Sequence, residues 1–305
     1  MGSMCELPTL RKIYCLLLAC LLAQPVSAGW RGGMFYSGLA DNGWQVYYWD
    51  GATGKESQIT KSPGDKRMPV WVPTLKKVVY KDSVGQICAV DLSGREETLV
   101  KGVRTCAHFT VTRDGSDIYY TRLLANNPLR QSLWHASSDD GFSKPELIFR
   151  MPRGSIRNVC LSPTGDTVAI SHVWRDNEER ILLLDLGALE KDATTTAIPI
   201  TPEHITAAFP RYGKDGKVIY FSKRVGRGNY DLFSFNLASK KTKPVFATAS
   251  VSEFYPVATS DGRWIFYEMR ENAGNAIAVY DMQNKTHRQL KLPRPAKEPC
   301  YIDQK

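Results

Sequence analysis

Few side chains in this chain have the types and spacing that catalysis requires. The five histidines stand singly along the sequence, at His108, His135, His172, His204 and His287. No G-x-S-x-G, H-E-x-x-H or P-loop motif occurs, so the patterns of a serine hydrolase, a zinc peptidase and a nucleotide-binding loop are missing. We therefore expect a protein without catalytic residues, metal or cofactor.

A recurrence of basic residues points to binding instead. Arg67, Arg157 and Lys297 occupy one position of a repeated segment, and aromatic residues stand at or beside that position in another repeat. Guanidinium groups bind carboxylates and phosphates through paired hydrogen bonds. We expect these side chains to surround one opening and to bind a protein segment or an anionic ligand; alternatively, the arginines only solvate the rim. The candidate residues are Arg67, Arg104, Arg157, Arg211, Phe254, Tyr255 and Lys297.

The elements that would position these residues follow from an internal repeat. Six segments share an apolar, β-rich run that is closed by a short polar residue, and their starts lie 41, 46, 48, 51 and 45 residues apart. That period is typical of a four-stranded propeller blade of roughly 40–50 residues. The segments are 44–50, 85–91, 131–137, 179–185, 230–236 and 275–281.

Further strands precede these segments. A second apolar run comes before each one, and tight turns such as Asp114-Gly115, Asp215-Gly216 and Asp261-Gly262 lead into most of these runs. Asp-Gly is a strong hairpin signal, because glycine accepts the positive φ that the turn requires. Helical periodicity is absent from residues 29–305, so the sequence predicts an all-β fold.

The innermost strands determine the number of blades. Alignment on the tight turns brings six positions into register, at Pro69, Phe109, Val159, Pro210, Pro256 and Pro299. The last inner strand, 298–303, has no unit after it, and the first unit, from Gly33, has no inner strand before it. The C-terminal strand can therefore complete the first blade, which closes the ring and removes its exposed edges. We predict a six-bladed β-propeller that the C-terminal strand closes.

The N-terminus has the features of an export signal. Arg11 and Lys12 precede an apolar run, 13–23, that is too short to span a bilayer, and small residues follow at 26–28. We predict a signal peptide over 1–28 and a propeller over 29–305, exported and periplasmic if the source is Gram-negative. A lipoprotein acylated at Cys20 is the alternative, and no later apolar run reaches membrane length.

Net charge and cysteine content restrict the possible functions less than the repeat does. The formal net charge is +9, and removal of residues 1–28 leaves +8, without a concentrated basic stripe. Nucleic-acid binding is therefore not expected for an exported chain. Four cysteines remain outside the signal, at long and irregular spacings that indicate neither a zinc site nor a disulfide framework. A monomer is expected.

The repeat resembles that of the TolB-like propeller family. The unit at 206–240 carries the family's inner-strand proline, Asp-Gly turn and Ser-x-Arg-x-Gly loop, and the unit at 253–283 matches nearly as well. The matching residues are Pro210, Asp215-Gly216, Ser222, Arg224, Gly226 and Tyr230, with Pro256 and Asp261-Gly262 in the next unit. The family's namesake is a periplasmic, non-enzymatic partner of the Tol–Pal envelope system and carries an α/β domain before its propeller. The resemblance here implies a stand-alone propeller without that domain.

Two classes of function follow. The first is a non-enzymatic scaffold in the cell envelope, which binds a protein segment or a ligand. The second is a polysaccharide or oligosaccharide lyase, or another glycan-processing enzyme, because related propellers host such sites. A lyase would require histidines or carboxylates gathered around one metal, and the scattered histidines argue against this.

The export signal can be tested directly. We expect the mature protein to begin near Gly29, because small residues at 26–28 follow a charged and then apolar segment. N-terminal sequencing or intact mass of the exported protein measures this. A mature chain that begins at an acylated Cys20 would contradict it and identify a lipoprotein.

Overall fold

The computed structural model describes residues 32–100, 103, 105–124, 127–175, 178–191, 196–226, 228–248, 250–271 and 274–303, with only the backbone of 124, 127–129 and 175. The predicted signal over 1–28 lies outside this range. None of the described helices is long and apolar enough to cross a bilayer.

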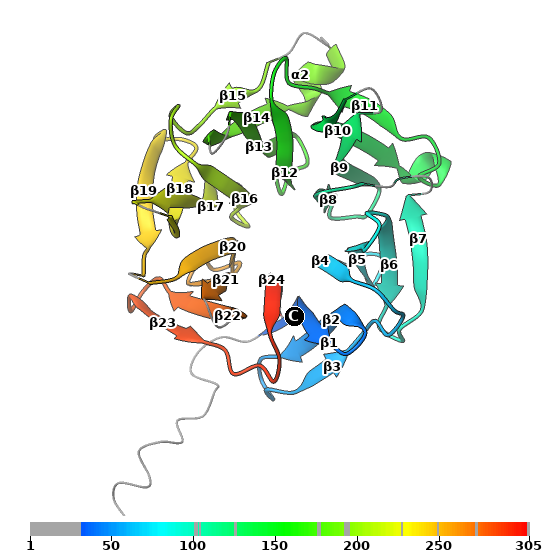
Figure 1. Ribbon diagram of the computed structural model, residues 1–305, viewed down its shortest axis with the longest axis vertical. Helices are drawn as coiled ribbons and strands as arrows, with labels where there is room; N and C mark the ends of the chain where they lie inside the picture. Colours follow the sequence, from blue (N-terminus) through cyan, green and yellow to red (C-terminus); the bar gives the residue numbers. More distant parts are fainter. Residues whose placement is uncertain are drawn as a thin grey trace, which may run out of the picture.

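Six four-stranded antiparallel sheets surround a central axis (Figure 1). We number the sheets as blades, starting from the one that contains the first strand. Blade one consists of β24 (Ala296–Asp303), β1 (Gly32–Ala40), β2 (Gly43–Asp50) and β3 (Glu56–Gln58). Blade two consists of β4 (Lys66–Val72), β5 (Lys77–Asp82), β6 (Ile87–Asp91) and β7 (Glu96–Val100). Blade three consists of β8 (Phe109–Val111), β9 (Asp117–Leu124), β10 (Asn127–Ser137) and β11 (Glu146–Phe149).

The other three blades continue the ring. Blade four consists of β12 (Ser155–Leu161), β13 (Thr167–Arg175), β14 (Glu178–Asp185) and β15 (Ile198–Pro199). Blade five consists of β16 (Ala207–Tyr212), β17 (Val218–Val225), β18 (Asn229–Asn236) and β19 (Lys241–Phe246). Blade six consists of β20 (Ser252–Ala258), β21 (Trp264–Glu271), β22 (Gly274–Asp281) and β23 (Thr286–Gln289). The predicted six-bladed propeller is confirmed.

The C-terminal strand closes the ring, as the sequence predicts. β24 pairs with β1 in an antiparallel register that opposes Gly33 to Ile302 and Met34 to Tyr301. The strand approaches closely, since a side chain at Gly32 would lie 2.5 Å from the Tyr301 hydroxyl. Blade one is therefore built from both ends of the described chain.

The inner strands share one irregularity. In the four blades whose aligned position is proline, the ladder shifts around that proline, and the residue before it has a positive φ: Met68 59°, Phe209 55°, Tyr255 51° and Glu298 56°. Proline has no N–H to donate, so a bulge removes it from the ladder. A left-handed backbone at a residue other than glycine costs roughly 1–3 kcal/mol. The backbone of these four residues is therefore strained, and the bulges keep it so.

Aspartate closes most of the third strands. The Oδ1 atoms of Asp50, Asp91 and Asp281 accept backbone N–H groups two residues further on, and Asp185 accepts one three residues on. These short polar side chains satisfy the N–H groups that the turn frees from the sheet. The polar residue that ends each repeated segment is thus a turn former.

The core lies between neighbouring blades. Tyr36 and Tyr301 of blade one pack with Phe266 and Val279 of blade six, and the Phe266 and Tyr301 rings stack with centroids 5.1 Å apart. Similar clusters fill the other interfaces. Each blade therefore depends on its neighbours for its buried apolar surface.

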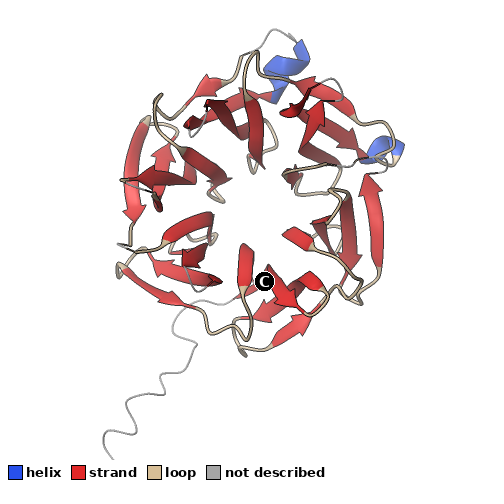
Figure 2. Ribbon diagram, viewed as in Figure 1, coloured by secondary structure: helices blue, strands red, loops and turns tan. Residues whose placement is uncertain are grey.

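Two short helices depart from the all-β expectation. The helix α2 (Leu186–Lys191) and a 3₁₀ turn (Ser138–Asp140) follow the third strands of blades four and three, at the periphery of the ring (Figure 2). A helix of one to two turns is too short to produce a detectable helical period, which explains the difference. The four described cysteines are free thiols.

Strand direction divides the loops between two faces. Inner strands begin on the upper face, which also carries the turns between second and third strands and the connections between blades. Inner strands end on the lower face, which carries the Asp-Gly turns and the turns between third and fourth strands. The two faces therefore have different kinds of loops.

Ring closure can be tested by truncation. Deletion of residues 296–305 removes Tyr301, which is 6% exposed, and Ala296, which is fully buried. Loss of a large buried aromatic alone costs about 3–5 kcal/mol, against a net stability of about 5–15 kcal/mol. We expect an insoluble or much less thermostable protein in calorimetry, and a smaller loss for Tyr301→Ala. A deletion variant that melts like the full chain would contradict closure by β24.

Candidate binding site

The candidate site surrounds the axis on the upper face, where the inner strands begin. The residue before each bulge is a cation on three strands: Arg67 on β4, Arg157 on β12 and Lys297 on β24. Phe254 holds the equivalent position on β20. Lys297 and Arg67 belong to adjacent blades, whereas Arg157 lies across the ring. The structure therefore divides the predicted basic ring into two parts.

Arg67 is bound within the fold. Its Nη2 donates to Glu298 Oε1 at 2.7 Å, and its Nε donates to Oε2 at 3.0 Å. Glu298 Oε2 also accepts the Ser37 hydroxyl and the Met68 N–H, each at 2.8 Å. Burial alone would raise the pKa of Glu298, but the Arg67 charge and these hydrogen bonds outweigh it and hold that pKa below its usual range. Arg67 therefore has no free charge to offer a ligand.

The charge of Lys297 is only partly compensated, by the nearby carboxylates of Glu268 and Glu298. Its Nζ lies 4.3 Å from the centroid of the Trp44 ring, over which the Arg67 guanidinium also lies at 5.4 Å. Burial, and then repulsion by Arg67, lower the pKa of Lys297. None of the ion pairs among the described residues includes Lys297. An anion beside Lys297 would relieve this repulsion.

Arg157 is the second free cation at the mouth. Its side chain is exposed, and it takes part in no ion pair within the described range. Beneath it, Glu179 is 8% exposed, with Oε1 2.6 Å from Ser171 Oγ. Burial raises the pKa of Glu179, while Ser171 and the charge of Arg157 partly offset this.

Phe254 lies at the mouth with a cation that the sequence reasoning missed. The Arg270 guanidinium lies 4.5 Å from the Phe254 ring centroid, and the centroid of the Tyr230 ring lies 4.9 Å from the same point. Arg270 Nη2 is also 3.0 Å from Oε1 of Glu268, which is fully buried. Phe254 is only 6% exposed, so it supports Arg270 more than it offers a surface of its own.

Tyr255 and Arg211 lie deeper, on the axis. Tyr255 and His108, from opposite blades six and three, are nearly parallel, with ring centroids 6.5 Å apart. The Arg211 guanidinium lies 5.8 Å from the Tyr255 ring, and its Nη2 is 3.4 Å from His108 Nε2. His108 is 1% exposed and Tyr255 7%. These side chains fill the axis below the mouth, so Tyr255 and Arg211 are not part of the rim.

Of the remaining predicted residues, Arg104 lies outside the described ones. Sequence reasoning also missed Trp44, Glu298 and His108. For Glu298 a signal was available, because it precedes an aligned inner-strand proline, where the bulge gives the residue before it a left-handed backbone. His108 precedes Phe109 at the equivalent position, without that positive φ. Trp44 follows a hairpin turn in blade one, and nothing in its local sequence connects it with Lys297.

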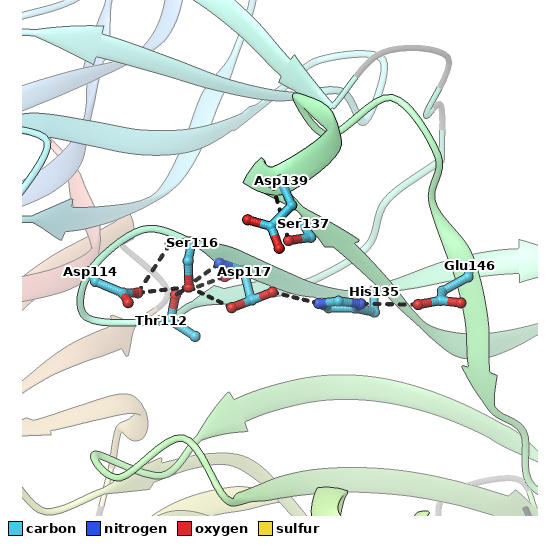
Figure 3. A network of polar contacts seen from close by, with 8 residues as sticks. All are labelled: Thr112, Asp114, Ser116, Asp117, His135, Ser137, Asp139 and Glu146. Carbon is cyan, nitrogen blue, oxygen red and sulfur yellow. Dashed lines mark hydrogen bonds and ion pairs between the residues drawn. The ribbon is translucent and has the colours of Figure 1, made fainter. Parts of the chain in front are cut away.

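A polar network on the lower face contains the serine, histidine and carboxylates that a catalytic site could use (Figure 3). His135 Nε2 lies 2.8 Å from Asp117 Oδ1, and its Nδ1 lies 3.4 Å from Glu146 Oε1. The Ser116 hydroxyl donates to Asp117 rather than to His135. A nucleophile must contact its base directly, which Ser116 does not. The network instead ties the Asp114–Asp117 turn to β10 and β11. Within the described part of the chain, no group of three or more His, Cys, Asp or Glu residues could hold a metal ion.

Comparison with solved structures identifies the fold. No family model matches the chain, and no curated protein matches its sequence. TolB from Acinetobacter baumannii superposes with a TM-score of 0.74 at 17% identity, over 95% of this chain and 70% of that one. The fold is that of a TolB-like β-propeller.

Two further structures extend the comparison. A putative TolB from Agrobacterium tumefaciens has a TM-score of 0.69 at 13% identity, over 91% of this chain and all of that one. An oligogalacturonate lyase from Vibrio parahaemolyticus has a TM-score of 0.59 at 14% identity, over 84% and 73%. At these identities the likeness concerns the fold alone, and a TolB-like propeller is compatible with either class of function.

A buried carboxyl beside the mouth predicts a pH dependence. Glu253 precedes Phe254 and is fully buried, and burial, with the Asp231 charge, raises its pKa to about 8. A carboxyl whose pKa is raised by folding stabilises the fold while protonated and destabilises it progressively as the pH rises from about 4.5 to 8.

We expect Glu253→Gln to remove this dependence, because an amide can keep the contact with Thr248 without ionising. The variant should be more stable than the wild type above pH 8, by a few kcal/mol at most, and similar near pH 5. Urea unfolding between pH 5 and 9 measures the difference. Parallel pH profiles for the two proteins would mean that Glu253 is ionised at neutral pH.

Proposed function

We propose that this TolB-like propeller is a non-enzymatic, exported binding scaffold, which holds an acidic protein segment or an anionic ligand at its upper mouth. The observation that carries the proposal is that Arg157 and Lys297 take part in no ion pair among the described residues, while Arg67 is bound to Glu298. The protein acts as a monomer in the cell envelope.

The geometry of the mouth favours binding over catalysis. Trp44 and Phe254 present apolar ring faces to Lys297 and Arg270, which restricts the motion of these long side chains. A cation held in place loses less entropy when it binds an anion. The filled axis beneath supports a ligand that rests on the mouth and does not pass through the ring.

The test uses variants that spare the buried pairs. Arg157→Gln combined with Lys297→Gln removes both free cations and leaves the contact of Arg67 with Glu298 intact. The probes are labelled poly-L-glutamate and a labelled oligogalacturonide, measured by fluorescence polarisation. Charge-assisted contacts contribute about 1.5–3 kcal/mol each, so we expect at least a tenfold weaker binding. Added salt should also weaken the wild-type complex.

A matched control tests the location. Lys144→Gln with Lys217→Gln removes two exposed cations from the lower face and should leave binding unchanged. Equal affinity of the wild type and the upper-mouth variant would reject the mouth as the site.

The glycan-processing alternative has one supporting observation, the likeness to an oligogalacturonate lyase. Incubation of the protein with oligogalacturonides and Mn²⁺ or Ca²⁺ tests it, with absorbance of the unsaturated product as the readout. Turnover by the wild type that is lost in Arg157→Gln would show that the protein is an enzyme and not a scaffold.

A further inference from the structure

The repeat gives the two faces of the propeller different electrostatic character. On the lower face, aspartates serve the turns, since their carboxylates accept the N–H groups that the turns free. The aspartates with such contacts are Asp50, Asp91, Asp114, Asp185, Asp215, Asp261 and Asp281. These turns therefore keep ionised carboxylates beside the basic residues of the lower face.

The upper face carries exposed cations, of which Arg270 pairs with Glu268. Arg150 and Arg153 are exposed on the connection between blades three and four, and the second strands of blades three, five and six carry Arg122, Arg224 and Arg270 near their ends. Several carboxyls near this face are withdrawn from solvent. Glu179, Glu253, Glu268 and Glu298 are at most 8% exposed.

Large apolar side chains protrude from the same face. Leu39 is 41% exposed, Val84 52%, Trp174 36% and Val225 42%. Each lies at or beside the turn between the second and third strands of its blade. The blades are one, two, four and five, so the apolar turns form two pairs on opposite sides of the ring (Figure 1).

The combination of cations and apolar turns identifies the kind of partner. Trp174 has the Arg153 guanidinium 6.0 Å from its ring, and Val225 follows Arg224 directly. Tryptophan and aliphatic side chains beside arginine suit the boundary between lipid headgroups and acyl chains. A segment bound at the mouth would not touch turns on opposite sides of the ring, whereas a flat surface pressed against the upper face would.

We propose that the upper face docks onto a membrane that contains anionic phospholipids. The apolar turns enter the headgroup region, and the arginines pair with lipid phosphates. The aspartates in the turns of the lower face would be repelled by the same surface, which favours an approach by the upper face. This proposal does not depend on the ligand at the mouth.

The experiment is sedimentation of the protein with vesicles of phosphatidylcholine alone or with 30% phosphatidylglycerol, a composition chosen for the assay. We expect binding only to the anionic vesicles, and less binding as salt increases. A cation near an anionic surface strengthens binding about fivefold, so Arg150→Gln with Arg153→Gln should weaken partitioning about 25-fold. Trp174→Ser with Val225→Ser should weaken it at least tenfold.

Controls of the same chemistry lie on the lower face. Lys144→Gln with Lys217→Gln, and Leu75→Ser with Leu92→Ser, should partition like the wild type. All variants are compared as the mature chain that begins near Gly29, so their differences report on the propeller alone.

The depth of insertion provides a second readout. Brominated lipids should quench part of the tryptophan fluorescence, and Trp174→Phe should remove most of that quenching. Equal partitioning of upper-face and lower-face variants, or unchanged quenching in Trp174→Phe, would overturn the proposal. So would poly-L-glutamate binding that depends on Arg150 and Arg153 without any vesicle binding, because it would assign the face to an acidic protein.

Discussion

Glu298 on β24 connects the strand that closes the ring to the blades on which it closes. Its carboxylate accepts hydrogen bonds from Ser37 in the same blade and from Arg67 and the Met68 N–H in the next one. The group is 3% exposed, so these interactions are shielded from water. Removal of one partner of a buried ion pair costs far more than the pair contributes, because the remaining charge is left without solvation. Glu298 therefore both holds the closing strand in place and reduces the charge that the upper mouth exposes.

The same interaction determines what the mouth has available for binding. Because Arg67 is committed to Glu298, Lys297 and Arg157 are the predicted cations that take part in no ion pair within the described range. Lys297 lies close enough to Arg67 to be repelled by it, and Trp44 holds both cations over its ring. The charge at the mouth thus depends on how the ring is closed.

The strained residues at the bulges place side chains on the axis of the ring. Proline interrupts the inner strands, and the residue before it adopts a left-handed backbone that directs its side chain inward. Phe209 and Tyr255 meet there with ring centroids 4.4 Å apart, and His108 stacks on Tyr255 from the opposite blade. Burial, and then the charges of Arg211 and Lys81, lower the pKa of His108 well below its usual value. Aromatic rings and the Arg211 guanidinium therefore fill the axis beneath the mouth.

The sequence by itself determined the all-β class, the six blades, the register of the inner strands and the closing strand. These depend on local patterns, namely apolar alternation, Asp-Gly turns and a period of blade length, which each unit carries within itself. It also placed the cations at the start of the inner strands. Only the tertiary structure decided that Arg67 is bound, that Lys297 and Arg157 are free, and that Tyr255 and Arg211 lie on the axis. Those outcomes depend on partners from other blades: Arg67 and Glu298 are 231 residues apart in the chain, and no local pattern records which side chain will meet which across the ring.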